Sequence, residues 1–350
     1  MGDIKSAIIG CGRIAGLSED TDTPSMPTTH AGAYKSLSSR VTLSAICDKD
    51  PGALSKFSKM WNVKNTYSSH KDLLRSEEIQ VLSVCVDAEH HYSICMDALS
   101  LSSSLRVIWC EKPMTLSLEQ SELLVRESEK RGVLIVVNHC RRWDPYYTLV
   151  SDLIDSGEIG EPYMILARSA VGLVNCGSHL FDLMIQCADS HVDYVFSDVI
   201  KDESVDPGGV GFVKFKNGVH GFVDCTWKEY FDFGISVRGT KGEIEVIETP
   251  THVREIEITK YTTLTESEKR KIEIPNSSTR MKDALLEILS NIEHSTPVRS
   301  SGTTGIHSLE VAQAFHESWE TGAKVLLPLK NRSRTLHSRK TSFTKNGELT

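Results

Sequence analysis

Residues 4–15, IKSAIIGCGRIA, contain the pattern that decides the fold of the first part of the chain. The apolar run is typical of a buried strand, and it leads directly into a G-x-G-x-x-A motif at residues 10–15. Glycines there let the backbone turn tightly and approach a pyrophosphate, whose charge the N-terminus of a following helix favours. Because the motif follows a strand and opens a helix, it predicts a dinucleotide site. The loop residues predicted to bind the cofactor are Gly10, Gly12, Arg13 and Ile14.

An acidic residue that binds the adenosine ribose is expected about 20 residues after such a loop, at the end of the second strand. Asp48 ends the apolar run 41–47, but it lies 33 residues beyond Ala15. A polar, proline-containing insertion at residues 16–29 accounts for the excess. A carboxylate at Asp48 would bind the ribose diol and repel a 2′-phosphate, so NAD is favoured over NADP. Asp48 as a simple turn residue remains the alternative, and neighbouring Lys49 keeps NADP open.

Strand-like and helical patterns alternate through the first 140 residues. The apolar runs are 4–10, 41–47, 79–86, 105–110 and 133–138. The amphipathic patterns between them are 30–37, 51–61, 90–100 and 116–132. Continuous apolar strands separated by helices predict a doubly wound parallel sheet covered on both faces, a Rossmann architecture.

The second half changes character after about residue 140. Consecutive strand patterns and two hairpin turns, KNG and GTKG, predict a mostly antiparallel open sheet in an α+β domain. Helical patterns lie at 145–156, around 177, at 279–293 and at 304–322. We therefore predict three parts: a nucleotide-binding domain at 1–140, a substrate-binding and oligomerisation domain at 141–328, and a solvated basic tail at 329–350.

Composition narrows the partners. The 350 residues carry a formal charge of -8 and no basic run in the folded body, which argues against a nucleic-acid surface. The nine cysteines are scattered without a C-x-x-C pair, as in a reducing compartment, and they suggest no metal site. No stretch is apolar over the length of a membrane span. We predict a cytoplasmic protein with no nucleic-acid or membrane partner and no metal.

Two later motifs carry candidate chemistry. Glu111-Lys112-Pro113 follows the fourth apolar run, and its simplest alternative is an exposed ion pair at a strand end. The stretch NCGSHLFD, residues 175–182, places Asn175, His179 and Asp182 at i, i+4 and i+7. On a helix these side chains share one face, which is either a substrate face or a buried core face with Asn175 as N-cap.

In these motifs the chain resembles the Gfo/Idh/MocA oxidoreductase family over nearly its whole length, to about residue 328. The similar segments are GCGRIA, the sequence VDAEHH at 86–91 with His91 in place, the EKP tripeptide, RRWDP at 141–145 and SGEIGEP at 156–162. VRGTKGEIEV and SLEVAQAFHESWETGAKVLLPL also fit. NCGSHLFD resembles the family's D-x-G-x-H-x-x-D, with Asn175 in place of the usual aspartate. A similar N-x-G-x-H occurs in the branch that acts on nucleotide-linked amino sugars.

The resemblance implies an NAD-dependent dehydrogenase or reductase acting on CH–OH groups, with Lys112, His179 and Asn175 as catalytic residues. Alcohol oxidation needs a base and a positive charge beside the developing alkoxide, which suit His179 and Lys112 respectively. The resemblance also implies a cis Lys112-Pro113 peptide. It adds His91, Glu111 and Lys112 to the cofactor site. The expected substrate-binding residues are Lys112, Arg142, Asn175, His179 and Asp182.

Several points stay open at this stage. Arg141 and Arg142 bind an anionic substrate group or cap a strand edge. The insertion at residues 16–29 is hypothesised to be a lid. The expected substrate is a sugar, a cyclitol or a nucleotide-linked amino sugar. The alternative functions are an NAD-dependent redox-elimination glycosidase and a non-catalytic regulator. A homodimer or homotetramer formed through the second domain's sheet is expected from the resemblance.

Overall fold

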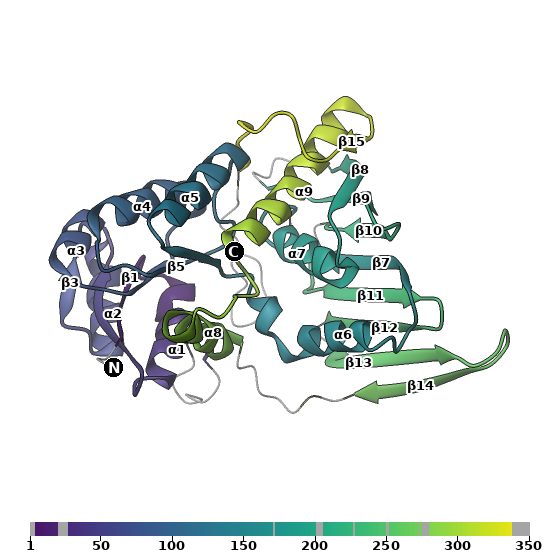
Figure 1. Cartoon of the computed structure of the whole chain (residues 1–350), viewed down its shortest axis with the longest axis horizontal. Coiled ribbons are helices and arrows are strands. Elements are labelled where there is room, and N and C mark those ends of the chain that lie inside the picture. Colours follow the sequence, from purple (N-terminus) through teal and green to yellow (C-terminus); the bar gives the residue numbers. More distant parts are fainter. Residues whose placement is uncertain are drawn as a thin grey trace. The chain divides into compact units, whose positions relative to one another are not determined.

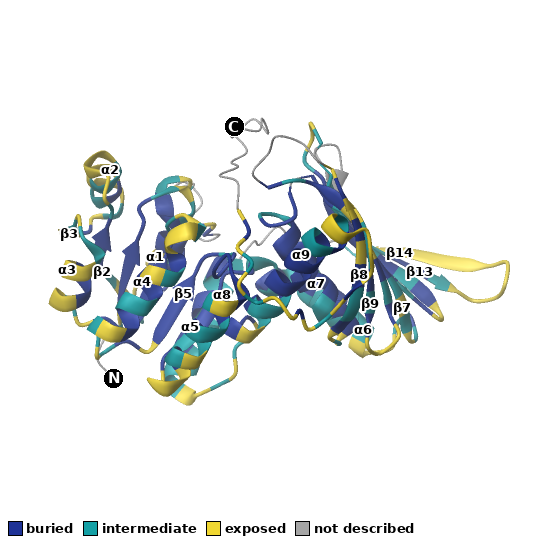
Figure 2. Ribbon diagram, turned by 90° about the horizontal axis from the view of Figure 1, so that it is seen from above, coloured by how far each residue is buried: buried dark blue, intermediate teal, exposed yellow. Residues whose placement is uncertain are grey.

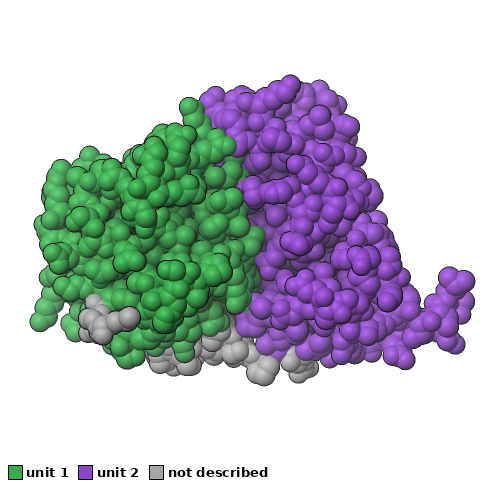
Figure 3. Space-filling view, viewed as in Figure 1, with its two compact units in different colours: residues 1–144, 277–306 green, residues 145–276, 307–350 purple. Residues whose placement is uncertain are grey.

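The computed structural model describes residues 4–19, 27–170, 172–200, 206–226, 228–249, 252–272, 274 and 280–337. The chain divides into two compact units, coloured separately in Figure 3. Unit 1 comprises residues 1–144 and 277–306, and unit 2 comprises residues 145–276 and 307–350. Each unit is built around a sheet of its own.

Unit 1 contains a six-stranded sheet, which is parallel as the alternating pattern predicted. Its order is β3-β2-β1-β4-β5-β6, so the direction of winding reverses between β1 and β4. The carboxyl ends of strands on either side of such a reversal form the usual crevice for a dinucleotide. The strands are β1 (Ile4–Ile9), β2 (Val41–Cys47), β3 (Asn65–Tyr67), β4 (Val81–Val84), β5 (Val107–Cys110) and β6 (Leu134–Val137).

Helices cover both faces of this sheet (Figure 1). The sequence did not predict β3 or α3, because three- and seven-residue elements are too short for a clear periodic signal. Side chains of α1 and α2 pack in one hydrophobic cluster, while those of α3, α4 and α5 pack in another. The helices up to residue 143 are η1 (Arg13–Leu17), α1 (His30–Ser36), α2 (Pro51–Trp61), α3 (His70–Ser76), α4 (Ala88–Leu101), α5 (Leu118–Lys130) and η2 (Cys140–Trp143).

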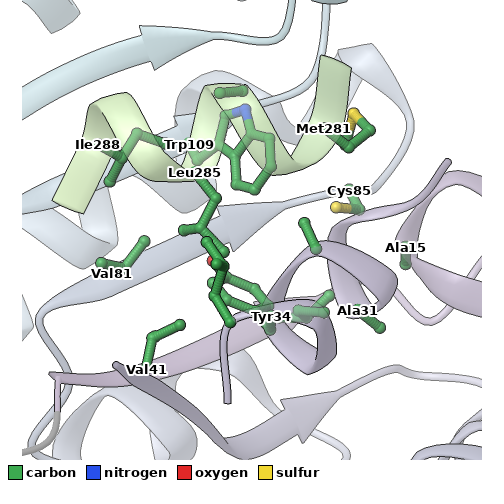
Figure 4. Packing of buried hydrophobic residues seen from close by; sticks show 14 of the residues in the cluster. Ala15, Ala31, Tyr34, Val41, Val81, Cys85, Trp109, Met281, Leu285 and Ile288 are labelled. Atoms are coloured by element: carbon green, nitrogen blue, oxygen red, sulfur yellow. The ribbon is translucent and has the colours of Figure 1, made fainter. Parts of the chain in front are cut away.

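Helix α8 (Arg280–His294) belongs to unit 1 although it follows unit 2 in the chain. Its apolar stripe includes Met281, Leu285 and Ile288, which are at most 1% exposed. Figure 4 shows these side chains in the same cluster as Trp109 and Tyr34. The sequence analysis placed residues 279–293 with the second domain, because periodicity reveals an apolar face without revealing its partner.

Unit 2 contains a nine-stranded sheet in the order β14-β13-β12-β11-β7-β10-β9-β8-β15. All its pairings are antiparallel except that between β7 and β10, so the prediction of a mostly antiparallel sheet is confirmed. The strands are β7 (Pro162–Ser169), β8 (Val192–Val199), β9 (Gly209–Phe215), β10 (His220–Asp224), β11 (Phe233–Gly239), β12 (Gly242–Thr249), β13 (His252–Tyr261), β14 (Ser267–Ile272) and β15 (Val325–Leu326).

One face of this sheet is covered by helices and the other is open (Figure 2). The covering helices are α6 (Pro145–Asp155), α7 (Gly177–Ala188) and most of α9 (Gly302–Thr321). Alternation along the strands follows from this arrangement. Val213 and Phe215 of β9 are 1% exposed on the covered face, while Val210 of the same strand is 42% exposed. The β13–β14 hairpin projects beyond the other strands.

The segment after β15 packs along α9 as far as the described residues extend. Leu329 and Leu336 are each 4% exposed, and Gln313 Nε2 donates to the carbonyl of Arg334 at 2.8 Å. Residues 329–337 therefore differ from the solvated tail that composition predicted, because two leucines and several ion pairs fix them on the helix. Arg339, Lys340 and Lys345 lie outside the described residues.

Candidate active site

The glycine loop has the geometry that close approach of a phosphate requires. Gly10 has φ +94°, and a Cβ there would lie 2.7 Å from the backbone carbonyl of Cys85. At Gly12, in contrast, nothing lies within 4 Å of the position a Cβ would occupy. Gly12 is the N-cap of η1, whose first N–H groups have no partner within the helix. The backbone at Gly12 is therefore open to the close approach that a bound pyrophosphate requires.

Asp48 is fixed against this loop by two backbone groups. Its Oδ2 accepts the N–H of Cys11 at 2.7 Å, and its Oδ1 accepts the N–H of Asp50 at 2.8 Å. Each carboxylate oxygen has two lone pairs, so one on each oxygen remains for a diol. Burial, and then the charge of Asp48, raise the pKa of the Cys47 thiol to about 12. The thiol is neutral at physiological pH and adds no competing negative charge.

Glu111 and Lys112 follow β5, and Glu111 is only 8% exposed. Its Oε1 is 3.0 Å from His30 Nε2 and 2.5 Å from Asn138 Nδ2, and its Oε2 accepts the N–H of Lys112 at 3.3 Å. Burial alone would raise the pKa of Glu111, but the hydrogen bonds from His30 and Asn138 and the charge of Lys112 hold it below its ordinary value. The Lys112-Pro113 peptide is cis, as the resemblance implied.

His91 is 1% exposed and bridges two loops at this edge of the sheet. Its Nδ1 lies 2.8 Å from the carbonyl oxygen of Pro113, and its Nε2 lies 2.9 Å from that of Val86. Burial lowers the pKa of His91 despite these carbonyl neighbours, which favour the charged form. Both ring nitrogens therefore face the backbone, and the imidazole holds the turn that contains Lys112.

Arg142 contacts the backbone within unit 1. Its Nη1 donates to the carbonyl of Arg299 at 2.8 Å, and Arg299 Nη1 donates back to the carbonyl of Arg142 at 3.3 Å. The two arginines thus join η2 to the segment between α8 and α9. The neighbouring Arg141 is also in η2 and is partly buried.

The NCGSHLFD motif lies in unit 2, at the start of α7. The helix begins at Gly177 with Cys176 as N-cap, so Asn175 lies outside it. The sequence expectation of three side chains stacked on one helix face therefore holds only for His179 and Asp182, which are separated by three residues. His179 is 6% exposed and Asp182 is 1% exposed.

Asp206 positions this motif and was missed by the sequence analysis. It is fully buried, and its two carboxylate oxygens accept the N–H groups of Val174 and Asn175, each at 2.8 Å. A Cβ at Gly172 would lie 2.4 Å from Asp206 Cγ, so the loop packs directly on the carboxylate. An Asp-Pro-Gly sequence reads as an ordinary turn, and nothing in the sequence connects it to a loop 31 residues away.

The insertion at residues 16–29 is closed at its base by Glu19. Its carboxylate accepts the N–H of Thr28 at 3.0 Å and that of Thr29 at 2.9 Å. Thr29 in turn is the N-cap of α1, and its side chain accepts the N–H of Gly32 at 3.1 Å. Residues 20–26, which are half of the hypothesised lid, lie outside the described residues.

No group of three or more His, Cys, Asp and Glu side chains is arranged to hold a metal ion in the ranges given above. In the same part of the chain, no helix has the length and apolar character needed to cross a membrane.

Comparison with known proteins assigns the chain to a family. Residues 4–139 match a model described as an oxidoreductase family with an NAD-binding Rossmann fold, and residues 167–245 match the GFO/IDH/MocA C-terminal domain. The chain belongs to the Gfo/Idh/MocA family. This membership confirms the predictions of fold class, of NAD as the cofactor and of an NAD-dependent dehydrogenase or reductase acting on CH–OH groups.

Relatives within the Gfo/Idh/MocA family match almost the full length. The chain is 23% identical to myo-inositol 2-dehydrogenase of Thermotoga maritima, over 93% of this chain and 98% of that protein. The WlbA dehydrogenase of Bordetella pertussis, solved with NADH and UDP-GlcNAcA, has a TM-score of 0.75 at 20% identity, over 94% and 100% of the two chains. A levoglucosan dehydrogenase complex with NADH gives 0.79 at 15% identity, over 93% and 99%. At these identities the two structures establish the fold.

Proposed function

We propose that the protein transfers a hydride between NAD and a secondary hydroxyl or ketone of a sugar, a cyclitol or a nucleotide-linked amino sugar. The observation that carries this proposal is the place of Lys112. It follows β5, and β1, β4 and β5 are parallel neighbours, so Lys112 and the Gly12 loop lie at the same carboxyl edge of the sheet. An ammonium at the edge that binds the cofactor suits alkoxide stabilisation.

The residues of unit 1 fit NAD. We propose that the backbone from Gly10 to Ile14, with Arg13, binds the pyrophosphate and that the free lone pairs of Asp48 bind the ribose diol. His91 and Glu111 then support the cofactor site indirectly, because their polar atoms already hold the backbone turn around Lys112. NAD, when bound, supplies the nicotinamide ring that accepts or returns a hydride. The carboxylate of Asp48 disfavours NADP through repulsion of its 2′-phosphate.

On the protein side, the proposed reaction needs a positive charge and a base. The Lys112 ammonium donates a hydrogen bond to the reacting oxygen and stabilises its negative charge. His179 takes the hydroxyl proton during oxidation and returns it during reduction. Asn175 hydrogen-bonds a substrate hydroxyl but cannot ionise, so it supports an imidazolium less than the family's usual aspartate. Asp182 and Arg142 complete the proposed substrate-binding residues.

The names of the relatives support a polyhydroxylated ring as substrate. Myo-inositol, levoglucosan and UDP-GlcNAcA occur in them, and all three carry secondary hydroxyl groups. The Asn175 variant of the motif favours the nucleotide-linked amino sugars within this set. The nine cysteines are all free thiols, which supports a cytoplasmic location.

The test is NADH absorbance with the purified full chain, NAD and a panel of inositols, free sugars and nucleotide-linked amino sugars. We expect turnover on at least one member. Lys112→Ala should then lower kcat by about 100-fold or more, since it removes the proposed alkoxide stabiliser. Lys130→Ala is the matched control, because Lys130 is exposed on α5 and pairs only with neighbouring Glu127 among the contacts described.

Three outcomes contradict the proposal in different ways. Full turnover by Lys112→Ala refutes the role of that residue. Release of free sugar from a glycoside without net NADH identifies a redox-elimination glycosidase. Tight binding of NADH together with a sugar, but no turnover on any member of the panel, identifies a regulator.

We also propose that the protein is a homodimer or homotetramer that associates through the open face of the unit 2 sheet. Phe196, Val210 and Phe222 are 50%, 42% and 45% exposed there. Phe212 lies on β9, paired with Phe196 of β8 on one side and Phe222 of β10 on the other. Its ring centroid is 5.3 Å from that of Phe222 and 5.9 Å from that of Tyr194. A contiguous exposed aromatic patch of this kind is typical of an interface.

A further inference from the structure

A continuous chain of buried polar groups runs through the core of unit 1 and ends at Glu111. Tyr34 Oη lies 2.7 Å from Ser83 Oγ, which lies 2.9 Å from His30 Nδ1. His30 Nε2 lies 3.0 Å from Glu111 Oε1, which also accepts from Asn138. His30 and Ser83 are fully buried, and Tyr34 is 1% exposed. Tyr34, Ser83 and His30 belong neither to the glycine loop nor to the proposed substrate-binding residues.

Glu111 is ionised, since its pKa is held below the ordinary value, so it can only accept. His30 therefore donates to Glu111 through Nε2, while its Nδ1 is hydrogen-bonded to the Ser83 hydroxyl, which in turn is hydrogen-bonded to the Tyr34 phenol. Each of these hydrogen bonds holds the next buried group in place.

Burial raises the pKa of the Tyr34 phenol far above its ordinary value, so the phenol is neutral at physiological pH. The hydrogen bonds among these buried groups hold them in place, which suits a positional role.

His30 makes a second contact with the same strand end. Its ring centroid lies 4.0 Å from that of Trp109. Trp109 is in β5, two residues before Glu111 in the sequence. Trp109 is fully buried, so the imidazole is fixed by packing as well as by both ring nitrogens. Glu111 Oε2 in turn accepts the backbone N–H of Lys112 at 3.3 Å. His30 lies 81 residues before Glu111 in the sequence. The Glu111 carboxylate nevertheless connects His30 to the backbone of Lys112, because it is hydrogen-bonded to both.

We propose that His30 is a positioning residue that sets the place of Lys112 by donating a hydrogen bond to Glu111. The inference rests on the proposed function, in which Lys112 acts on the substrate oxygen. His30 is fully buried and does not reach that oxygen itself. Its loss would leave Glu111 with one donor fewer in the core, and the carboxylate would move to find another. A displacement of the Lys112 backbone by about 1 Å is enough to lower a rate by about 100-fold.

The experiment compares His30→Leu, which removes the donor, with His30→Gln, whose amide can donate to Glu111 in place of Nε2. Tyr34→Phe is the control, because it removes a polar group of the same buried chain that is three hydrogen bonds away from Glu111. The first readout needs no substrate. It is hydrogen exchange, followed by mass spectrometry, of the segment 111–116, whose Lys112 amide is held by Glu111. The second is kcat and KM with whichever substrate of the panel is turned over.

We expect His30→Leu to speed exchange of segment 111–116 by about tenfold, because the Lys112 amide loses a fixed acceptor. It should lower kcat by about 10- to 100-fold with little change in KM for NAD, since the glycine loop is untouched. His30→Gln should restore both values to within about threefold of the unaltered protein. Tyr34→Phe should leave both readouts near their starting values.

The outcomes separate this inference from the proposed function. Unchanged exchange and unchanged kcat in His30→Leu overturn the inference, and so does an equal loss in Tyr34→Phe. If Lys112→Ala keeps full turnover, the proposed catalytic role of Lys112 fails, while hydrogen exchange still tests whether His30 positions the turn. Should His30→Leu not fold, Glu111→Gln replaces it, because its amide has a single acceptor oxygen for three donors; unaltered exchange of Lys112 in that variant also overturns the inference.

Discussion

At the residue scale, Asp48 joins two segments that are 37 residues apart in the sequence. Its carboxylate holds the Cys11 and Asp50 amides, so it fixes the glycine loop at the end of β2. The same two oxygens keep lone pairs for a ribose diol. Loss of the side chain therefore removes a proposed cofactor contact and also loosens the loop that forms the pyrophosphate cradle.

Asp48→Ala should weaken NADH binding by about tenfold or more, which corresponds to the loss of about 1.4 kcal/mol or more in binding free energy. The preference for NADH over NADPH should narrow, because the repulsion of a 2′-phosphate is gone. Titration of intrinsic fluorescence with each nucleotide measures both effects. Asp72→Ala is the control, since its carboxylate is 66% exposed on α3. A dissociation constant for NADH that does not change would contradict the role given to Asp48.

At the element scale, α9 and the segment after β15 stabilise each other. Leu329 N–H donates to Glu310 Oε1 at 2.9 Å, and Arg332 and Arg334 pair with Glu310 and Glu320. His316 lies between these pairs on the same helix. Burial, and then the positive charge of Arg334, lower the pKa of His316 to about 4, with the carboxylate of Glu320 opposing them.

A lowered histidine pKa makes stability depend on pH with a defined sign. The unfolded chain binds a proton at His316 near pH 6.5, whereas the folded chain does so only near pH 4, so unfolding is favoured as the pH falls between these values. Between about pH 7 and about pH 5, protonation of His316 in the unfolded chain should lower the free energy of unfolding by about 2 kcal/mol. His316→Gln should remove this decrease, as measured by urea unfolding at the two pH values.

The control for this prediction is His294→Gln. The His294 side chain is 66% exposed at the end of α8, so its replacement should leave the pH dependence unchanged. Equal pH dependence in the unaltered protein and His316→Gln would show that His316 titrates normally in the folded state.

At the scale of the whole molecule, the proposed oligomer would bury the open sheet face. Phe222→Asp places a charge within the aromatic patch, where burial without a partner is costly. Light scattering after size exclusion should show a smaller mass for this variant than for the unaltered chain. Met60→Ser is the control, because Met60 is 36% exposed on α2 and is not part of the sheet. A monomeric mass for the unaltered chain would refute the proposed oligomer.

The sequence by itself determined the parallel character of the first sheet and five of its six strands, the glycine loop, the position of Asp48 at the end of β2 and the mostly antiparallel character of the second sheet. These features follow from local signals: apolar periodicity, glycine spacing and turn chemistry. The sequence places Asp48 at the end of the second strand despite the insertion, because a charged residue after an apolar run can be recognised whatever the length of the preceding loop. The family motifs also marked Lys112 and His179 as candidate catalytic residues.

Only the tertiary structure decided which distant residues hold these motifs. Three contacts join positions far apart in the chain: His30 pairs with Glu111, Asp206 accepts the N–H of Asn175, and α8 packs on α1. Periodicity shows that a face is buried, and composition shows that a segment is polar. Neither shows the partner, because hydrogen bonds and close packing depend on distances in space that local sequence does not encode.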